Sequence, residues 1–491
     1  MNVNRKLIQK AEELKPALLK RRVKLAGTEQ CLQEGDSEVY DFGEHLTGRL
    51  AVAFSYEGHH PDAPALLRIH FAENVRELEE DAAAYRGWIS PSWIQTETFH
   101  VDRIPGTFRL GRRYAFRYVR IEVLSLSTRF TLKIRGLTAV SETSADEAKL
   151  PSLSAELLPR GEEELLSGID SVACRTLREC MQEVFEDGPK RDRRLWLGDL
   201  RLQALTNYVT YRNNDLVKRC LYLFAGTAFP DGRLASNVFV EPRVEADDSY
   251  MFDYAMLFVK ALQDYVNETE DSDCLRELWP AACKQILGAE QYFGEDGLIH
   301  APEEPVWCFL DWNLELDKET GALGVWLYCA EAAVDLARRL KDHSFTEEIC
   351  EKIRIRREAA RTLLRTPDGL FTSGPMKQIS MASQVWAILG GISSDPGILT
   401  RAEQCGALKM VSPYLCHYYI EALIKTGKKQ EALDMILRYW GGMIREGADT
   451  FWELYDPEDP DASPYGGTVV NSYCHAWSCT PAYFIREGLL V

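Results

Sequence analysis

The sequence predicts an antiparallel β-sandwich followed by an all-α (α/α)6 toroid. Apolar residues alternate with a period of 2 over roughly residues 36–140, and the period changes to 3.6 from about residue 162. The second part holds about twelve helical segments, and six pairs of helices are what such a toroid requires. A chain of 491 residues is also too long for one small core, which indicates two or more domains.

Three segments precede the helical part. Residues 1–35 begin with a charged amphipathic stretch and are expected to form an N-terminal helical segment. Residues 36–140 are expected to form the β-sandwich domain, because their alternation suits half-buried strands and turn signals separate the runs. The alternation is clear at Leu50, Val52, Phe54 and Tyr56. Residues 141–161 are polar and contain two prolines, which predicts a linker.

Residues 162–491 are expected to form the helical domain. After a first helix from about residue 162, helical segments are expected near residues 200–212, 214–226, 252–268, 272–293, 321–341, 344–365, 378–390, 397–406, 413–426, 428–445 and 469–488. Long loops at 227–250, 294–320 and 446–468 interrupt them. Such loops are uncommon in a compact domain unless they carry function, so we expect the functional residues there.

Charge and composition exclude several classes of protein. The net charge of −18 leaves no basic surplus for a nucleic acid or an anionic membrane. The N-terminus lacks the apolar run of a secretory signal, and no stretch approaches the roughly 18 apolar residues of a membrane span. The 13 cysteines are scattered without a CxxC pair, which argues against a disulfide or zinc framework and favours reduced thiols in the cytoplasm. No metal or organic cofactor is expected.

The stretch DGPKRDRRLWLGD combines acids, cations and an aromatic residue in one turn. Gly188 and Pro189 break any helix and require a shaped loop. Asp187, Asp192 and Asp199 lie among cations such as Arg191, where burial or neighbouring charge can tune their pKa values. Trp196 adds a flat apolar face. Carboxylates beside an aromatic plate suit a sugar-cleaving site, and the alternative is a solvated, self-neutralising surface turn.

Two of the long loops carry further candidates. Asp253 follows the first loop and is either a first-turn helix acid or a ligand-binding residue. In the second loop, Trp307 and Trp312 flank Asp311, and an acid among aromatic residues needs a partner. That requirement favours a binding site over plain core.

The third loop and the residues after it complete the set. Trp452 and Glu453 precede an acidic stretch that is interpreted as a solvated loop, because it lacks the spacing of a calcium-binding EF-hand. His475 and Trp477 follow it and suit the binding of sugar hydroxyls, although a lone histidine is more often structural. The chain has no GxSxG, P-loop or HExxH motif, so a carbohydrate site is the favoured interpretation.

Five motifs occur together along the chain: VYDFGEHLTGRL, DGPKRDRRLWLGD, FLDW, TFWE and NSYCHAW. With them the chain resembles the glycoside hydrolase family 78 α-L-rhamnosidases of bacteria over nearly its whole length. The resemblance implies a β-sandwich followed by a six-hairpin glycosidase domain. The C-terminal β-sandwich of the family is expected to be absent, because the chain stops at Val491.

The resemblance also implies roles for individual residues. Asp192 matches the general acid and Glu453 the general base of an inverting hydrolase, in which room for a water separates the two carboxyl groups. The positions implied or expected to bind the sugar are Asp187, Arg191, Trp196, Asp199, Asp253, Trp307, Asp311, Trp312, Trp452, His475 and Trp477. Many family members carry Glu at the position of Asp192. The loop is therefore re-tuned for the shorter side chain, or a neighbour such as Asp199 is the donor, or the activity is weak.

These observations predict a glycoside hydrolase that removes terminal α-L-rhamnose from glycosides or oligosaccharides with inversion. One alternative is an (α/α)6 glycosidase for another sugar. Another is a non-catalytic carbohydrate-binding relative with a degenerate acid. We expect no nucleic-acid or membrane partner, and a homodimer stays open as the assembly state.

Overall fold

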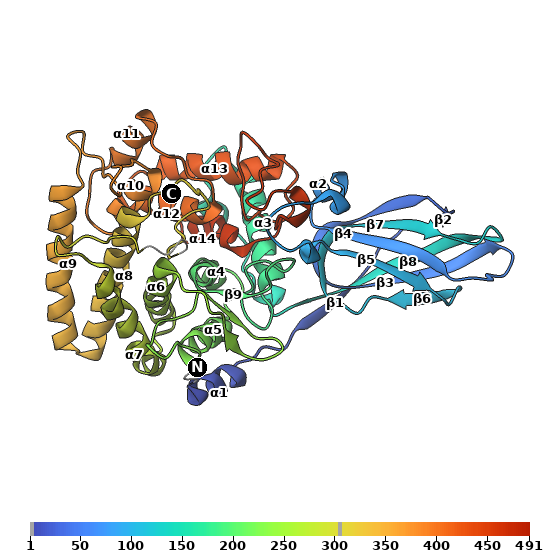
Figure 1. Ribbon diagram of the computed structural model, residues 1–491, viewed down its shortest axis with the longest axis horizontal. Helices are drawn as coiled ribbons and strands as arrows, with labels where there is room; N and C mark the ends of the chain where they lie inside the picture. Colours follow the sequence, from blue (N-terminus) through green and yellow to red (C-terminus); the bar gives the residue numbers. More distant parts are fainter. Residues whose placement is uncertain (1–3, 303–306) are drawn as a thin grey trace.

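The computed structural model describes residues 4–302 and 307–491, and it has the predicted order of a sheet domain followed by a helical domain (Figure 1). The strands of the large sheet are β1 (Leu19–Lys24), β2 (Gln30–Leu32), β3 (Ser37–Gly58), β4 (Ala65–Ala72), β5 (Thr96–Val101), β6 (Gly106–Arg109), β7 (Tyr114–Ser125) and β8 (Phe130–Thr143). They are antiparallel in the order β1-β8-β3-β7-β4-β5, with β2 also on β8 and β6 also on β3.

The long strand β3 joins the two ends of the sheet. Its first half pairs with β7, its second half pairs with β8 and β6, and Gly48 pairs with both Tyr114 and Ser141 at the change of partner. Apolar residues of β3, β4, β7 and β8 form a core of their own, including Val52, which is fully buried. The period-2 pattern of the sequence thus marks the buried side of this sheet.

The expectation of a helical segment over residues 1–35 is wrong for most of its length. Only Arg5–Glu13 is helical (α1), and β1 and β2 belong to the sheet. In the sequence LKRRVK of β1 nearly all side chains are exposed, so no alternation of apolar residues marks the strand. Backbone pairing with β8 holds it, and its cations suit a sheet edge because they discourage pairing with other chains.

In the part of the chain that the structure describes, twelve α-helices follow the sheet. They are α3 (Glu163–Cys180), α4 (Leu197–Val209), α5 (Asn214–Gly226), α6 (Phe252–Thr269), α7 (Ser272–Gly288), α8 (Glu319–Leu340), α9 (His343–Leu363), α10 (Met381–Leu389), α11 (Ile398–Gln404), α12 (Pro413–Lys425), α13 (Lys429–Arg445) and α14 (Pro481–Arg486). The helix expected at 469–488 is short, because 3-10 turns at Thr468–Val470 and Ala476–Cys479 replace its first part. A small sheet of β9 (Leu195–Trp196), β10 (Asn237–Phe239) and β11 (Glu245–Ala246) flanks α4.

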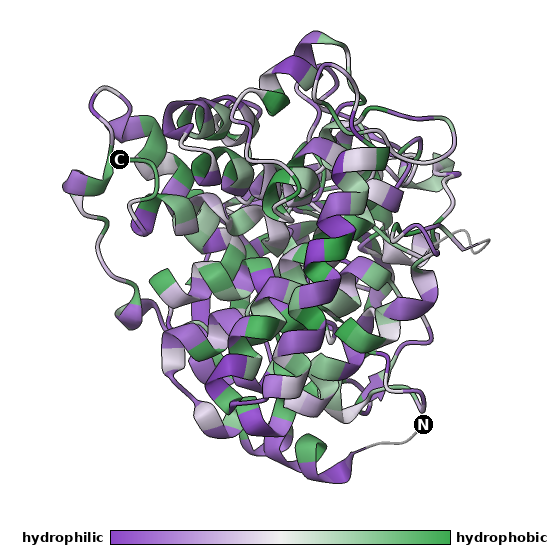
Figure 2. Ribbon diagram, turned by 90° about the vertical axis from the view of Figure 1, so that its left-hand side faces the viewer, coloured by the Kyte–Doolittle hydropathy of each residue, from purple (hydrophilic) through white to green (hydrophobic). Residues whose placement is uncertain are grey.

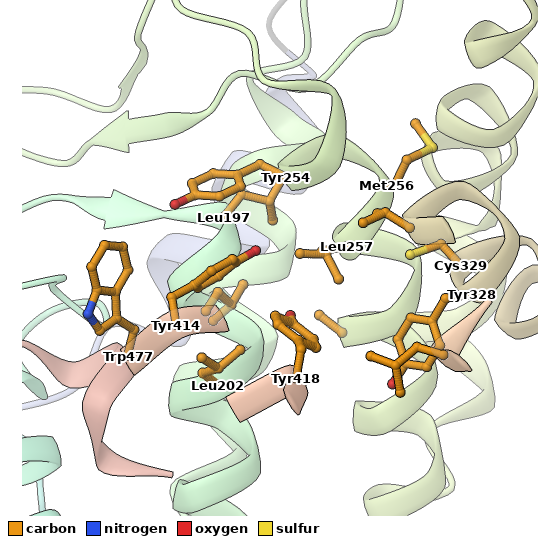
Figure 3. Packing of buried hydrophobic residues seen from close by; sticks show 14 of the residues in the cluster. Leu197, Leu202, Tyr254, Met256, Leu257, Tyr328, Cys329, Tyr414, Tyr418 and Trp477 are labelled. Atoms are coloured by element: carbon orange, nitrogen blue, oxygen red, sulfur yellow. The ribbon is translucent and has the colours of Figure 1, made fainter. Parts of the chain in front are cut away.

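Alternate helices form an inner layer. Contacts run from α4 to α6, α8, α10 and α12 in turn, and the 3-10 turn Ala476–Cys479 contacts both α12 and α4, which closes the series. Figure 3 shows apolar side chains of these elements, such as Leu202, Tyr254 and Tyr414, gathered in one cluster. In Figure 2, hydrophilic and hydrophobic residues alternate along the outer helices, as expected for helices with one buried side. None of the helices in the described residues is long and apolar enough to span a membrane.

Replacing Gly324 by Ala is expected to destabilise the helical domain. At Gly324 helix α8 crosses α10 so closely that a Cβ atom would lie 2.5 Å from the backbone oxygen of Trp386. Since backbone atoms must shift to relieve the overlap, we expect the free energy of unfolding to fall by about 1–3 kcal/mol in urea titrations. Gly168→Ala in α3 is the control, because a Cβ there meets nothing within 4 Å, and it should raise stability by up to about 1 kcal/mol. Equal stability of the two variants would contradict the close crossing.

Candidate active site

The loop between α3 and α4 is organised around Asp187. Its carboxylate accepts hydrogen bonds from the backbone N–H groups of Asp192 (2.8 Å) and Arg194 (3.0 Å), and its own N–H donates to the carbonyl of Arg194 (3.0 Å). Burial, and then the nearby charge of Asp192, raise the pKa of Asp187 to about 7. Asp187 therefore closes the loop and fixes where the side chains between Gly188 and Arg194 can point.

Lys190 and Arg191 of this loop are buried and Arg193 and Arg194 are partly buried, so the alternative of a solvated surface turn is wrong. Lys190 is fully buried, and its ammonium group binds the carboxylate of Glu77 and the carbonyls of Val469 (3.0 Å) and Asn471 (2.9 Å). Arg191 is also buried, and its Nε donates to the carbonyl of Val470 (3.1 Å). These contacts attach the loop to residues 469–471.

Arg191 brings the two candidate catalytic carboxyl groups together. One terminal nitrogen of its guanidinium binds Oε2 of Glu453, and the other lies 3.6 Å from Oδ1 of Asp192. The Glu453 side chain is 5% exposed and the Asp192 side chain 20% exposed, so Asp192 is the one that faces solvent. Among the described residues, no donor forms a hydrogen bond to the Asp192 carboxyl group.

Asp199, His475 and Trp477 form a second group beside Glu453. The Nε2 atom of His475 lies 3.1 Å from Oδ1 of Asp199, and the rings of His475 and Trp477 are 4.3 Å apart. Trp477 donates from its indole nitrogen to the carbonyl of Glu453 (3.0 Å). Burial raises the pKa of Asp199. For His475 burial acts to lower the pKa, but the hydrogen bond to Asp199 and the charge of Glu453 raise it above its usual value.

Two aromatic candidates, Trp196 and Trp312, are only partly buried. Trp196 packs edge-on against Tyr254 with a ring distance of 6.3 Å. Trp312 packs edge-on against Phe309 (5.2 Å) and Tyr465 (5.6 Å). The Nε1 atom of Trp312 is buried and has no hydrogen-bond partner within the described residues. Both indole rings therefore keep part of their surface exposed. The indole nitrogen of Trp312 also has its donor free of any partner among the described residues.

Four other candidates, two acids and two tryptophans, are buried, and they hydrogen-bond to or pack against neighbouring segments of the chain. Asp253 accepts from the backbone N–H groups of Phe309 (3.0 Å) and Leu310 (2.9 Å). Asp311 accepts from those of Val411 (3.0 Å) and Ser412 (2.9 Å), and burial raises its pKa to about 6.

The other two of these buried candidates are tryptophans. Trp307 packs against Phe252 (5.9 Å between rings), and Trp452 packs against Tyr473 (5.1 Å). The structure thus places the side chains of Asp253, Asp311, Trp307 and Trp452 in contact with protein rather than with solvent.

Sequence reasoning missed Tyr465. Its hydroxyl donates to Oε1 of Glu453, and the guanidinium of Arg191 lies over its ring at 3.8 Å. The stretch around it, DPEDPDASPYGG, was interpreted as a solvated acidic loop, and Tyr465 is buried in spite of that composition. The one feature of the sequence that could indicate a role for Tyr465 is the occurrence of an aromatic residue between Pro464 and Gly466 in so polar a loop. No group of three or more His, Cys, Asp or Glu side chains that could hold a metal ion occurs among the described residues.

Comparisons with known proteins identify both domains of the chain. Residues 11–141 match the N-terminal domain of the glycosyl hydrolase family 78 α-rhamnosidases, and residues 160–339 match the six-hairpin glycosidase domain of bacterial α-L-rhamnosidases. No curated protein matches the chain.

Several solved structures are similar to the whole chain. A rhamnosidase from Klebsiella oxytoca with rhamnose bound is 40% identical, with 99% of both chains covered and a TM-score of 0.93. A family 78 rhamnosidase of Bacillus sp. GL1 is 21% identical over 93% of this chain and 47% of its own, with a TM-score of 0.76. The Streptomyces avermitilis α-L-rhamnosidase complexed with L-rhamnose is 16% identical over 96% of this chain and 44% of its own, with a TM-score of 0.66. The chain therefore belongs to the glycoside hydrolase family 78 α-L-rhamnosidases.

Proposed function

We propose that this protein removes terminal α-L-rhamnose from glycosides or oligosaccharides with inversion, using Asp192 as general acid and Glu453 as general base. The observation that carries the proposal is the single guanidinium of Arg191, which contacts both carboxyl groups. Two carboxyl groups that contact one guanidinium lie close enough together to act on the same glycosidic bond, as the carboxyl pair of a glycosidase must. The rhamnose bound to the Klebsiella oxytoca rhamnosidase supports the choice of sugar.

The surroundings of the two carboxyl groups suit different tasks. Glu453 is buried and accepts hydrogen bonds from Arg191 and Tyr465, which fix the orientation of a group that would activate a water. Asp192 faces solvent and its carboxyl group makes no hydrogen bond within the described residues, so it is free to contact the glycosidic oxygen of a bound substrate.

Asp187 and Asp199 are less suited to be the acid. Both oxygens of Asp187 already accept backbone N–H groups, and Asp199 is paired with His475. The Asp199–His475 pair is placed to bind ring hydroxyls by charge-assisted hydrogen bonds. Trp312 and Trp196 keep apolar surface for the methyl group and ring face of a 6-deoxy sugar.

The test is hydrolysis of a panel of aryl glycosides, followed by NMR of the released sugar. We expect turnover of the aryl α-L-rhamnoside and β-L-rhamnose as the first product, because inversion changes the anomeric configuration. Initial release of α-L-rhamnose would overturn inversion, and faster turnover of another glycoside would favour a different sugar. A thermal shift with free rhamnose but no turnover on the panel would favour a carbohydrate-binding protein.

Asp192→Asn is expected to make the rate strongly dependent on the leaving group. Without a general acid, an aryl rhamnoside with a basic leaving group should lose about 10²–10⁴-fold in kcat/KM. A dinitrophenyl rhamnoside should lose far less, since its leaving group departs without a proton. Wild-type and variant rates are compared on both substrates, and equal losses on both would remove Asp192 from the acid role. Asp459→Asn, at an exposed acid of the late loop, is the matched control and should keep both rates.

A further inference from the structure

Both oxygens of the Glu453 carboxylate are held by separate donors. Arg191 binds Oε2, and the hydroxyl of Tyr465 binds Oε1. Burial, and then the charge of Glu453, raise the pKa of Tyr465 well above its usual value, so the hydroxyl keeps its proton and remains a donor. With both oxygens bound, the plane of the carboxylate is fixed.

Tyr465 is in turn held by the sheet domain. The hydroxyl of Tyr85 donates to the carbonyl of Tyr465 (2.8 Å), and Trp88 donates from its indole nitrogen to the carbonyl of Pro464 (2.8 Å). The rings of Trp88 and Tyr465 lie 5.4 Å apart. A Cβ atom on Gly87 would overlap the carbonyl of Tyr465, so the two segments touch along their backbones.

This contact belongs to a wider junction between the domains. Tyr85 and Trp88 lie in the connection between β4 and β5 that also contains α2 (Arg76–Glu79), which faces the helical domain in Figure 1. From the same connection, Glu80 accepts hydrogen bonds from the hydroxyl of Thr468 (2.6 Å) and the N–H of Val469 (3.1 Å). The loop that carries Tyr465 is therefore fixed by the sheet domain on both sides of Tyr465.

We propose that Tyr465 is a positioning residue that orients the Glu453 carboxylate, and that Tyr85 and Trp88 of the sheet domain hold Tyr465 in place. The sheet domain then acts in the reaction by supporting the base. The inference rests on the proposed role of Glu453.

The expected effect follows from the groups that face Glu453. Arg191 and Tyr465 are the side-chain donors to its two oxygens among the described residues. Removing the tyrosine hydroxyl leaves Oε1 without this donor, so the carboxyl group can turn while Arg191 still holds Oε2. The chemical step should then slow, because a catalytic group must be held in the productive geometry.

The experiment measures kcat and KM for an aryl α-L-rhamnoside. In Tyr465→Phe kcat should fall by about 10- to 100-fold while KM stays near the wild-type value, because the hydroxyl acts on the orientation of Glu453. Tyr85→Phe should lower kcat in the same way by a smaller amount, because it only loosens Tyr465. Tyr40→Phe is the matched control, since the hydroxyl of Tyr40 in β3 is buried without a partner among the described residues, and its kcat and KM should equal those of the wild type.

The outcomes separate this inference from the proposed function. Wild-type protein without rhamnoside hydrolysis overturns the proposed function and this inference with it. An active wild type overturns the role of Tyr465 alone if a folded Tyr465→Phe variant keeps kcat, or if kcat and KM change together, because a purely structural loss affects substrate binding as well as the rate. If thermal unfolding shows that Tyr465→Phe is not folded, Tyr85→Phe decides. An unchanged kcat in that variant, or an equal loss in Tyr40→Phe, overturns the inference.

Discussion

Glu453→Gln is expected to lower kcat by about 10²–10⁴-fold on every aryl α-L-rhamnoside, whatever its leaving group. The amide keeps the size of the side chain but cannot take the proton of the attacking water. Its oxygen can keep the hydrogen bond from Arg191, and its NH2 group can donate to the hydroxyl oxygen of Tyr465, so the side chain can stay in place. The measurement is kcat and KM on substrates with good and poor leaving groups, beside a thermal unfolding curve.

The control for this variant is Glu458→Gln. Glu458 lies in the same late loop and is exposed, so the kcat of the Glu458→Gln variant should equal that of the wild type. The acid and base variants should also differ from each other, because only Asp192→Asn is expected to spare the activated substrate. A folded Glu453→Gln variant that keeps more than about a tenth of the wild-type kcat would contradict the base role.

Local patterns of the sequence were sufficient for most of the fold. The helix expected at 252–268 is α6 at Phe252–Thr269, because a 3.6-residue apolar period describes a helix with one buried side wherever the rest of the chain lies. The strand β1 was missed for the opposite reason. Its side chains are almost all exposed, and only the pairing of its backbone with β8, far along the chain, makes it a strand.

The site, like the fold, has one part that local sequence patterns predict and another that depends on contacts between distant residues. Asp192 and Glu453 could be named because each lies in a short motif. Their meeting depends on Arg191, whose guanidinium reaches a residue 262 positions away. Tyr465 gains its place from Tyr85, 380 positions earlier, and no local pattern can indicate such a contact. Asp253 and Asp311 look like ligand-binding acids in sequence, yet in the structure they accept backbone N–H groups of distant loops.

Lys190→Met is expected to destabilise the protein by about 3–5 kcal/mol, because it removes one partner of a buried ion pair. Lys190 and Glu77 are both almost fully buried, and they join the loop between α3 and α4 to the sheet domain. Without the ammonium group, the carbonyls of Val469 and Asn471 also lose their donor. The measurement is urea-induced unfolding, together with kcat, which should fall because Arg191 is the next residue.

A double variant identifies the cause of that loss. In Lys190→Met with Glu77→Gln the unpaired charge is gone, and the amide can still accept the N–H groups of Glu73 and Asn74 through one oxygen. The double variant should therefore be more stable than Lys190→Met and less stable than the wild type. Lys10→Met is the matched control, since Lys10 pairs with Glu277 where both side chains are partly exposed, and it should cost at most about 1 kcal/mol. A double variant no more stable than Lys190→Met would show that the loss comes from the missing hydrogen bonds to the two carbonyls, and not from an unpaired charge on Glu77.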